Sequence, residues 1–356
     1  MGSLALDANT TGYSNVSVGV NAAGATTVGF SNIAIGHGAL HTNVDGSRSV
    51  AIGTSALYTQ EPASAVSMYN TAVGHDAGKL VTTGTQNTLV GGLAGGSLTV
   101  AINNVAVGTS ALSSDTKGSA SVAIGRDALG SQNFTSATDA YNVAVGAQAG
   151  SAVTTGTNNT LIGGLAGDAI TTASNNVGIG LNAAGGTTTG ANNIAIGTNS
   201  LLTNTTGASN VSVGTYALNA NTTASNNTAV GTSALTANTT GNDNAGFGFK
   251  ALTVNTTGND NTASGAYSLQ RNTTGSSNVS MGYDALGSNT TASNNTAVGY
   301  ESLQANTTGA NNVAIGKDAM IANTTAASNV AIGVDAMDAN TTGADNVAVG
   351  RDALGA

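Results

Sequence analysis

A glycine recurs at a fixed spacing along the whole chain, and this period constrains the fold more than any other feature. From Gly2 to Gly350 there are 21 such glycines, most of them closing a pentad similar to Asn-Val-Ala-Ile-Gly. Eighteen of the 20 intervals are 17 residues long. The two intervals of 21 residues run from Gly53 to Gly74 and from Gly125 to Gly146. A period that never slips predicts a solenoid, in which each repeat forms one turn and stacks on its neighbours.

The composition excludes most alternatives to a solenoid. Only 7% of the 356 residues are charged, and Phe occurs four times, which is too little bulky material for ordinary globular cores. Hydrophobic residues make up 40% of the chain, too many for a charge-rich disordered protein, and a single Pro excludes collagen. We therefore expect a chain of small residues that packs by repetition.

Charge and cysteine content exclude several classes of function. Lys and Arg number only eight and are scattered, whereas nucleic-acid binding needs them clustered. The sequence contains no Cys, so disulfides, thiolate catalysis and Cys-ligated metals are absent. No apolar run approaches the ~20 residues that span a bilayer, so we expect no membrane insertion.

The residues before each glycine alternate as in a strand. Counted from the glycine, position −1 is Val, Ile, Phe or Met in 19 of 20 turns, with Ser264 as the exception, and position −3 is mostly Val, Ile or Thr. Position −2 is nearly always Ala, Ser or Gly, as at Ala34 and Ala314. Because side chains alternate across a strand, both faces are apolar and neither is typical of a solvated face. We expect one face inside the chain's own coil and the small-residue face, at position −2, buried between chains.

The residues after the glycine complete the expected turn. Position +3 is Ala or Ser in all 21 turns, and position +4 is Leu or Met in 15. We expect two short strands and two bends per turn, forming an all-β parallel β-roll that associates as a homotrimeric rod. Leu89 and Leu161 break the small-residue rule at position −2, and Gly then replaces Leu at position +4 of the same and the preceding turn: Gly78, Gly95, Gly150 and Gly167. This exchange predicts that the two positions meet in one core.

Asparagine occupies two positions of the turn. Position −4 is Asn in 18 of 20 turns, which predicts a stacked ladder of side-chain amides. A second Asn opens an Asn-Thr-Thr bend, where Asn favours the turn conformation. Each of these bends is also an Asn-x-Thr acceptor sequence, so a row of N-linked glycans is the alternative to turn chemistry alone. The candidate acceptors are Asn204, Asn221, Asn238, Asn255, Asn272, Asn289, Asn306, Asn323 and Asn340.

The two longer repeats predict loops near residues 58–69 and 131–141. Insertions in solenoids often form the binding face, so the aromatic residues of these segments, Tyr58, Tyr69, Phe134 and Tyr141, are candidates for recognition. A duplicated structural bulge explains the insertions equally well, because similar sequences follow them at 86–95 and 158–167.

Few residues offer chemistry. Asp318, Asp335 and Asp352 hold one position in consecutive turns and could share a Ca²⁺ ion, or be neutralised by the adjacent Lys317 and Arg351. No nucleophile–base pair or carboxylate pair in an aromatic-lined cleft is visible. We therefore predict no catalytic site, no cofactor and no enzymatic activity.

The repeat resembles two known kinds of fibre. The pentads Ser49-Val50-Ala51-Ile52-Gly53 and Ser121-Val122-Ala123-Ile124-Gly125 resemble the head repeat of trimeric autotransporter adhesins. The longer unit, with Ser302-Leu303 and Asn306-Thr307-Thr308-Gly309, is similar to shaft repeats of phage tail-fibre-like proteins. The adhesin resemblance implies a trimeric left-handed parallel β-roll that binds matrix proteins or host surfaces. The chain departs from that family in its 17-residue repeat, which is longer than usual, and in lacking a visible stalk or anchor after Leu354.

These features predict one continuous solenoid over residues 1–356, as a segment of a longer fibre or a subunit that stacks end to end. The expected function is that of an extracellular structural or adhesive fibre, namely a surface adhesin or appendage. The alternative is the shaft of a phage tail fibre that presents a separate tip, and a glycan- or ice-binding solenoid is a lesser alternative. The expected partners are further copies of the chain and a cell-surface receptor or glycan.

Overall fold

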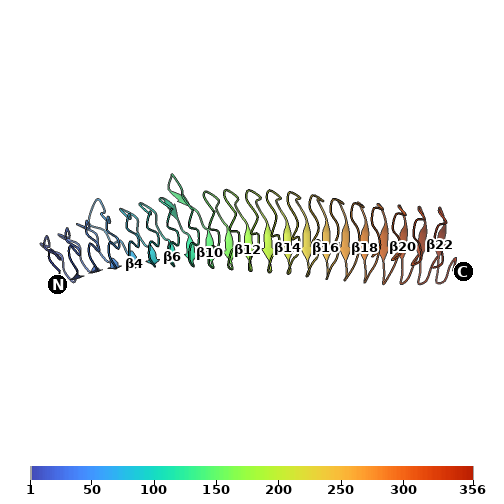
Figure 1. Cartoon of the computed structure of the whole chain (residues 1–356), viewed down its shortest axis with the longest axis horizontal. Helices are drawn as coiled ribbons and strands as arrows, with labels where there is room; N and C mark the ends of the chain where they lie inside the picture. Colours follow the sequence, from blue (N-terminus) through green and yellow to red (C-terminus); the bar gives the residue numbers. More distant parts are fainter. Residues whose placement is uncertain (1, 356) are drawn as a thin grey trace. The chain divides into compact units, whose positions relative to one another are not determined.

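The computed structural model describes residues 2–355 as an all-β parallel solenoid with turns of about 17 residues, which confirms the predicted fold class. No helix occurs among these residues. The chain forms two compact units, Met1–Gly178 (unit 1) and Ile179–Ala356 (unit 2). Figure 1 shows one short strand in most turns of each unit.

The strands are two or three residues long. Those of unit 1 are β1 (Val16–Val18), β2 (Ile33–Ile35), β3 (Val50–Ile52), β4 (Thr71–Val73), β5 (Thr88–Val90), β6 (Val105–Val107), β7 (Gly118–Ser119), β8 (Val122–Ile124), β9 (Thr138–Asp139), β10 (Val143–Val145) and β11 (Thr160–Ile162). The strand β12 (Val177–Ile179) covers the boundary between the units. Those of unit 2 are β13 (Ile194–Ile196), β14 (Val211–Val213), β15 (Thr228–Val230), β16 (Ala245–Phe247), β17 (Thr262–Ser264), β18 (Val279–Met281), β19 (Thr296–Val298), β20 (Val313–Ile315), β21 (Val330–Ile332) and β22 (Val347–Val349).

The three-residue strands stack in parallel so that equivalent positions of successive turns lie side by side. In unit 2, for example, Ala314 of β20 pairs with Ala331 of β21. Val, Ile and Thr at positions −3 and −1 favour this extended backbone. From β2 onward, the middle residue of each three-residue strand within the two units is buried. The register therefore follows directly from the sequence period.

The second half of the turn is a pair of bends, and the prediction of two strands per turn is wrong. Positions +2 and +4 have positive φ, as at Ser233 (φ +58°) and Leu235 (φ +51°). A left-handed residue interrupts an extended run, and two of them two residues apart turn the chain through the bend. Outside the stacked three-residue strands, β7 pairs with β9 in the region of the second insertion, and Ser47 forms an isolated parallel bridge with Ser67 in the region of the first.

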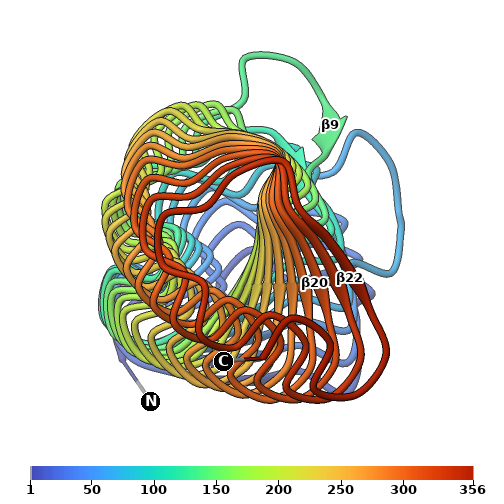
Figure 2. The same cartoon turned by 90° about the vertical axis from the view of Figure 1, so that its right-hand side faces the viewer.

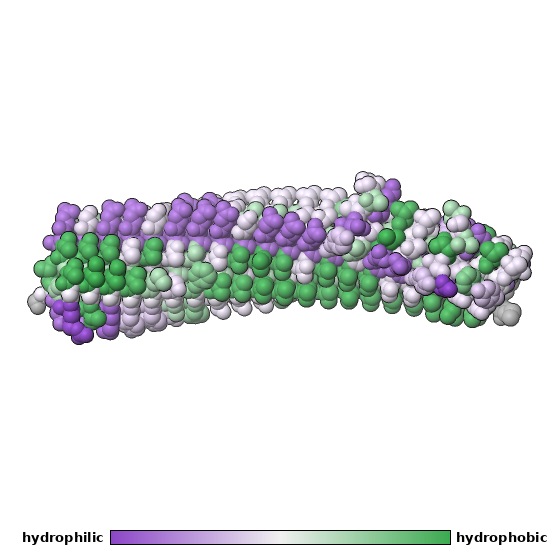
Figure 3. All heavy atoms as spheres, turned by 180° about the vertical axis from the view of Figure 1, so that it is seen from behind, coloured by the Kyte–Doolittle hydropathy of each residue, from purple (hydrophilic) through white to green (hydrophobic). Residues whose placement is uncertain are grey.

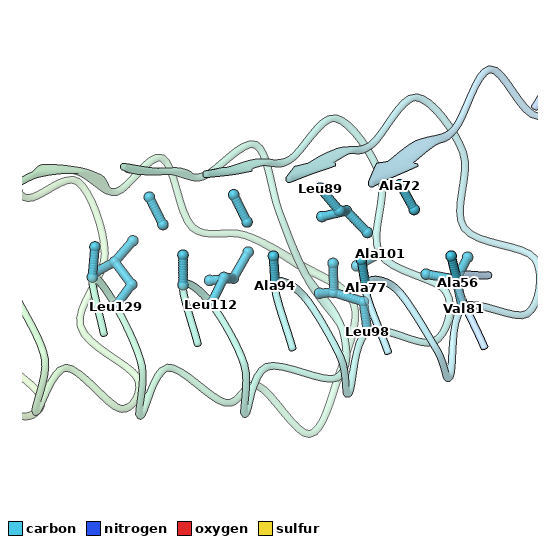
Figure 4. Close-up of a cluster of buried hydrophobic side chains, with 14 of the residues drawn as sticks. Ala56, Ala72, Ala77, Val81, Leu89, Ala94, Leu98, Ala101, Leu112 and Leu129 are labelled. Carbon is cyan, nitrogen blue, oxygen red and sulfur yellow. The ribbon is translucent and has the colours of Figure 1, made fainter. Parts of the chain in front are cut away.

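The core of each unit lies inside the coil. It consists mainly of Ala at positions −2 and +3 with Leu at position +4, joined in some turns of unit 1 by an aliphatic residue at position +7 such as Leu98. Figure 4 shows this packing around Ala77, Leu98 and Leu112. Unit 2 repeats the pattern, with Ala314 and Leu303 fully buried. The prediction that the small-residue position −2 is buried between chains is therefore wrong. A 17-residue turn closes around its own small side chains, and these fill its narrow interior.

The predicted exchange between Leu and Gly is confirmed. A Cβ added to Gly78 would lie 2.6 Å from Leu89 Cδ1, and one added to Gly95 would lie 2.7 Å from Leu89 Cδ2. Leu89 thus occupies the space that Leu side chains fill in the other turns. Leu161 does the same between Gly150 and Gly167. The total volume of the core is conserved while its position changes.

The predicted Asn ladder at position −4 is also confirmed. The Asn87 Oδ1 atom accepts hydrogen bonds from the backbone N–H of Asn104 at 3.0 Å and from Asn104 Nδ2 at 3.2 Å. Asn104 Nδ2 donates in addition to the carbonyl oxygen of Gly118 at 3.0 Å. Each buried amide therefore ties one turn to the next and satisfies backbone groups that have no water.

The periodic glycine is required by the stacking itself. Gly108 has φ of +132°, and a Cβ there would lie 2.6 Å from the carbonyl oxygen of Gly125 in the next turn. Only glycine permits both this conformation and this approach.

Candidate functional site

The strands present an apolar face to the outside of the coil. Positions −3 and −1 point away from the core, so that in β20 Ala314 is 0% exposed while its neighbour Ile315 is 39% exposed. The exposed large hydrophobic residues at these positions are Val16, Val18, Ile35, Ile52, Ile124 and Ile162 in unit 1, and Ile194, Ile196, Val230, Phe247, Val279, Met281, Ile315, Ile332, Val347 and Val349 in unit 2. We call these residues the outer strand face. Figure 3 shows hydrophobic side chains gathered in rows along the coils.

The chemistry of the outer strand face is uniform. Positions −3 and −1 carry no charged residue in any turn, and only Thr and Ser supply polar atoms there. A strand face in contact with water normally carries polar side chains. Soluble monomers rarely expose contiguous apolar patches larger than a few hundred Å². This surface is therefore suited to contact with another apolar surface.

The two insertions form loops in unit 1, and the structure separates the four aromatic candidates. Tyr69 and Tyr141 hold equivalent positions before β4 and β10 and are 52% and 57% exposed. Phe134 is only 6% exposed, and Tyr58 is half-buried and stacks on His41 with the ring centroids 4.8 Å apart. Figure 2 shows the loop that carries β9 projecting from the coils around it. Tyr69 and Tyr141 remain accessible for recognition, whereas Phe134 packs inward.

A buried glutamine that the sequence analysis missed anchors each loop. Gln132 Nε2 donates to the Asp115 carboxylate at 2.6 Å and to Ser121 Oγ at 3.1 Å. Its Oε1 atom accepts from Asn142 Nδ2 at 2.8 Å. One side chain therefore joins the two sides of the coil beneath the second loop.

The same arrangement occurs 72 residues earlier. Gln60 Nε2 donates to Ser49 Oγ at 3.0 Å, and Gln60 Oε1 accepts from Asn70 Nδ2 at 2.9 Å. Ser49 and Ser121 are the two residues that interrupt the Asn column at position −4, and each precedes a Gln at position +7. The short Ser leaves room for the long Gln. The joint occurrence of Ser at position −4 and Gln at position +7 therefore indicates the buried glutamine in the sequence.

Arg48 contacts a group of aromatic rings beside the first loop, of which Tyr13 and Tyr69 are exposed and Phe30 is half-buried. Its guanidinium carbon lies 5.2 Å from the Phe30 ring centroid and 5.6 Å from that of Tyr69, and Nη1 donates to Tyr69 Oη at 3.0 Å. Tyr13 stacks on Phe30 with centroids 4.9 Å apart. Cation–π contacts of this kind stabilise the position of an otherwise mobile side chain. The Tyr69 ring is therefore exposed to solvent, and its contacts with Arg48 hold it in one orientation.

Unit 2 carries an aromatic ladder on its surface, which the sequence analysis also missed. Phe249, Tyr267, Tyr283 and Tyr300 lie on four consecutive turns with ring centroids 5.4, 5.7 and 5.4 Å apart. A hydrogen bond to Glu301, together with its charge, raises the pKa of the Tyr300 hydroxyl. Ring contacts at these distances stabilise adjacent turns.

The candidate glycan acceptors do not present free amides in the folded chain. Asn221 is typical, because its Nδ2 atom donates to Asn204 Oδ1 at 2.8 Å and to the carbonyl oxygen of Ala224 at 3.0 Å. The fully buried members are Asn204, Asn221, Asn238, Asn255, Asn272, Asn289, Asn306 and Asn323. Asn340 is partly exposed, and its Nδ2 atom donates to the carbonyl oxygen of Gly343 at 2.9 Å. The structure therefore favours turn chemistry, since the amides form a second internal ladder.

The structure does not bring the aspartate column together as a ligand set. Within residues 2–355, no three His, Asp or Glu side chains gather closely enough to hold a metal ion. Lys317 pairs with Asp318, and this contact raises the pKa of the Lys317 ammonium. Asp335 and Asp352 hold the equivalent position in the next two turns. Local pairing with a cation is thus the observed arrangement at Asp318.

No protein-family model matches the sequence, and no curated protein matches it either. The part of the chain that the structure describes contains no helix long and apolar enough to cross a membrane.

Proposed function

We propose that this chain is a structural and adhesive fibre protein of a cell or virion exterior, assembled from copies that pack through the outer strand face. The observation that carries the proposal is the combination of a complete core inside each coil with a second apolar surface outside it. The outer strand face contributes nothing to the internal core, so its apolar character needs another explanation. Contact between copies supplies one, because it removes this surface from water.

The repeat supports copies of the chain as the occupant of this face. Every turn offers the same two outward positions, so a contact made at one turn can be repeated at the next. Rotational symmetry places the same surface of each copy around one axis, which suits a face that is uniform along the chain. A homotrimer is the simplest such assembly for a fibre, and both a surface adhesin and a tail-fibre shaft belong to this class.

The adhesive part of the proposal rests on the exposed side chains of unit 1. Tyr69 and Tyr141 are more than half exposed and stand beside the two loops, away from the buried middle residues of the strands. Tyrosine is enriched at protein interfaces because it combines an apolar ring with a hydrogen-bonding hydroxyl. A cell-surface receptor or glycan is the proposed partner.

Two pairs of variants in unit 2 test the assembly face. Val230→Lys with Ile315→Lys places two charges on the outer strand face, whereas Leu181→Lys with Val254→Lys places them on exposed apolar residues elsewhere. Light scattering should give a trimeric mass for the unmodified chain and for the second pair, and a monomeric mass for the first. A monomeric unmodified chain, or an unchanged mass for the first pair, would overturn the proposal.

A further inference from the structure

Two adjoining cavities form one groove along unit 1. The first has a volume of about 430 Å³ and is lined by Ser110, Asp127 and Gln148 at position +2, with Ser113 and Ser151 at position +5. The second, of about 300 Å³, shares Ser110 and Ser113 and continues to Asp76, Leu80 and Leu93. Five consecutive turns thus contribute to the groove, which is roughly 20 Å long at the usual spacing of strands. Cavities of this size are within the range of small-ligand sites.

The side chains at positions +5 and +6 are small in four of the five turns of the groove, whereas the turn at one end carries Lys79-Leu80 there. The pairs there are Gly96-Ser97, Ser113-Ser114, Gly130-Ser131 and Ser151-Ala152. In unit 2 the same positions carry larger residues, such as Thr253-Val254 and Gln270-Arg271. Single small pairs occur at these positions elsewhere, as at Gly185-Gly186 and Gly287-Ser288, but four such pairs in successive turns occur only in this part of unit 1.

The lining offers hydrogen-bonding groups that the chain itself does not use. Among the described residues, Ser110, Ser131 and Gln148 have no side-chain hydrogen-bond partner. A hydroxyl both donates and accepts, and a carboxamide does the same through its two ends. These groups therefore suit a ligand that carries many hydroxyls.

The charges of the groove favour an uncharged ligand. Asp76 pairs with Lys79 at 3.2 Å, and Asp127 pairs with Arg126 at 2.5 Å. Each carboxylate already has a cation beside it, so the groove presents neither a cluster of positive charge for a polyanion nor one of negative charge for a polycation. At one end, exposed Leu80 and Leu93 supply apolar surface for the carbon face of a sugar ring.

The spacing of the lining separates a glycan from an extended peptide. Equivalent groups recur once per turn, about 4.8 Å apart, whereas an extended peptide repeats its side chains every two residues, about 6.7 Å. A peptide therefore loses register within two turns. One pyranose unit of an extended glycan is about as long as one turn is high, so successive sugars can meet successive turns.

We infer that the unit 1 groove binds a linear, uncharged oligosaccharide, with one sugar per turn. This inference rests on the proposed adhesive function and names the class of its ligand. Ser110 and Gln148 donate to and accept from sugar hydroxyls, and the wall at position +5 is small in four of the five turns, so that the rings fit there.

Calorimetry with the full chain and neutral hexasaccharides tests the groove. The probes are cellohexaose, maltohexaose and the hexamer of N-acetylglucosamine, with a sulfated heparin hexasaccharide for comparison. At least one neutral hexamer should bind, and the dimer and tetramer of the same sugar should bind more weakly. Binding of none of them, or of the sulfated probe alone, would overturn the inference.

Matched variants locate the site. Ser110→Trp should weaken binding at least tenfold, and Gln148→Ala should weaken it severalfold without adding bulk. Ser233→Trp is the control, because Ser233 holds the same position +2 in unit 2 with φ of +58° against +56° for Ser110. Equal binding by Ser110→Trp and Ser233→Trp would contradict the site. The assembly mass of each variant separates the two proposals: an assembled chain that binds no saccharide refutes the groove alone, and a monomer that binds saccharide refutes the assembly alone.

Discussion

Ala314 and Ile315 are adjacent residues of β20 that belong to opposite surfaces, since Ala314 is enclosed in the core and Ile315 lies on the outer strand face. The alternation of a strand therefore separates the residues that fold one chain from those available to join several. Neighbouring substitutions can test folding and assembly independently.

A charge at Ala314 should prevent folding, whereas a charge at Ile315 should prevent assembly alone. Ala314→Glu buries a carboxylate in the apolar core of unit 2, at a cost of several kcal/mol. Ile315→Glu leaves the core intact. Circular dichroism on heating should show a large loss of stability for Ala314→Glu only, and wild-type melting by that variant would refute the position of the core.

The periodic glycine should tolerate no side chain. Gly108→Ala places a Cβ against the carbonyl oxygen of Gly125 in a conformation that costs roughly 1–3 kcal/mol for the backbone alone. Gly92→Ala is the control, because a Cβ at Gly92 meets no atom within 4 Å. The denaturation midpoint should fall for the first variant and stay near the wild-type value for the second. Similar midpoints would show that the turns stack less closely than described.

The second Asn ladder should stabilise the fold and carry no glycan. Asn255 Nδ2 donates to Asn238 Oδ1 at 2.8 Å and to the carbonyl oxygen of Gly258 at 2.9 Å. Asn255→Ala removes the donor to the buried Asn238 Oδ1 atom and the acceptor of Asn272 Nδ2, which should lower stability by about 1–3 kcal/mol. Thr257→Ala, at an exposed position of the same bend, should change it little. Mass spectrometry of the chain from its native source should find Asn255 unmodified, and a glycan there would contradict the buried ladder.

Stability should respond to the protonation of Asp168. Burial raises the pKa of this carboxyl above its ordinary value, although the N–H groups of Asp168 and Ala169 act to lower it. The folded chain then holds the proton more tightly than the unfolded chain, so this residue's contribution to stability falls as pH rises from the unfolded to the folded pKa. Asp168→Asn should therefore melt at a higher temperature than the wild type at pH 7 and lose that advantage at pH 3. An advantage that grows on acidification would reverse the sign of the argument.

Much of this fold could be predicted from the period alone. The exchange of Leu89 against Gly78 and Gly95 revealed which positions share a core, because volume must be conserved in a closely packed interior. Which face of the strand points into the core could not be predicted in the same way. Both of its faces are apolar, and only the closure of the turn shows that Ala rather than Ile points inward.

The bends were predicted wrongly, and the choice between turn chemistry and glycan acceptors stayed open, for a related reason. Leu235 adopts positive φ, which glycine would signal but leucine does not, so the second half of the turn was read as a strand. Asn221 fits both a turn and an acceptor sequence, and only the contact with Asn204 shows its amide to be internal. The buried positions of Gln60 and Gln132 could have been predicted, because each Gln accompanies a Ser that replaces the usual Asn at position −4.

The most direct test of the account is whether the outer strand face is covered in solution. The chain has no cysteine, so single variants can be labelled specifically with a maleimide. Ile315→Cys should react slowly at concentrations where the chain assembles, and Val254→Cys, an exposed apolar position outside the strands, should react quickly. Dilution below the assembly concentration should bring the two rates together. Equal rates at high concentration would show that the outer strand face is open to water, and would contradict assembly through it.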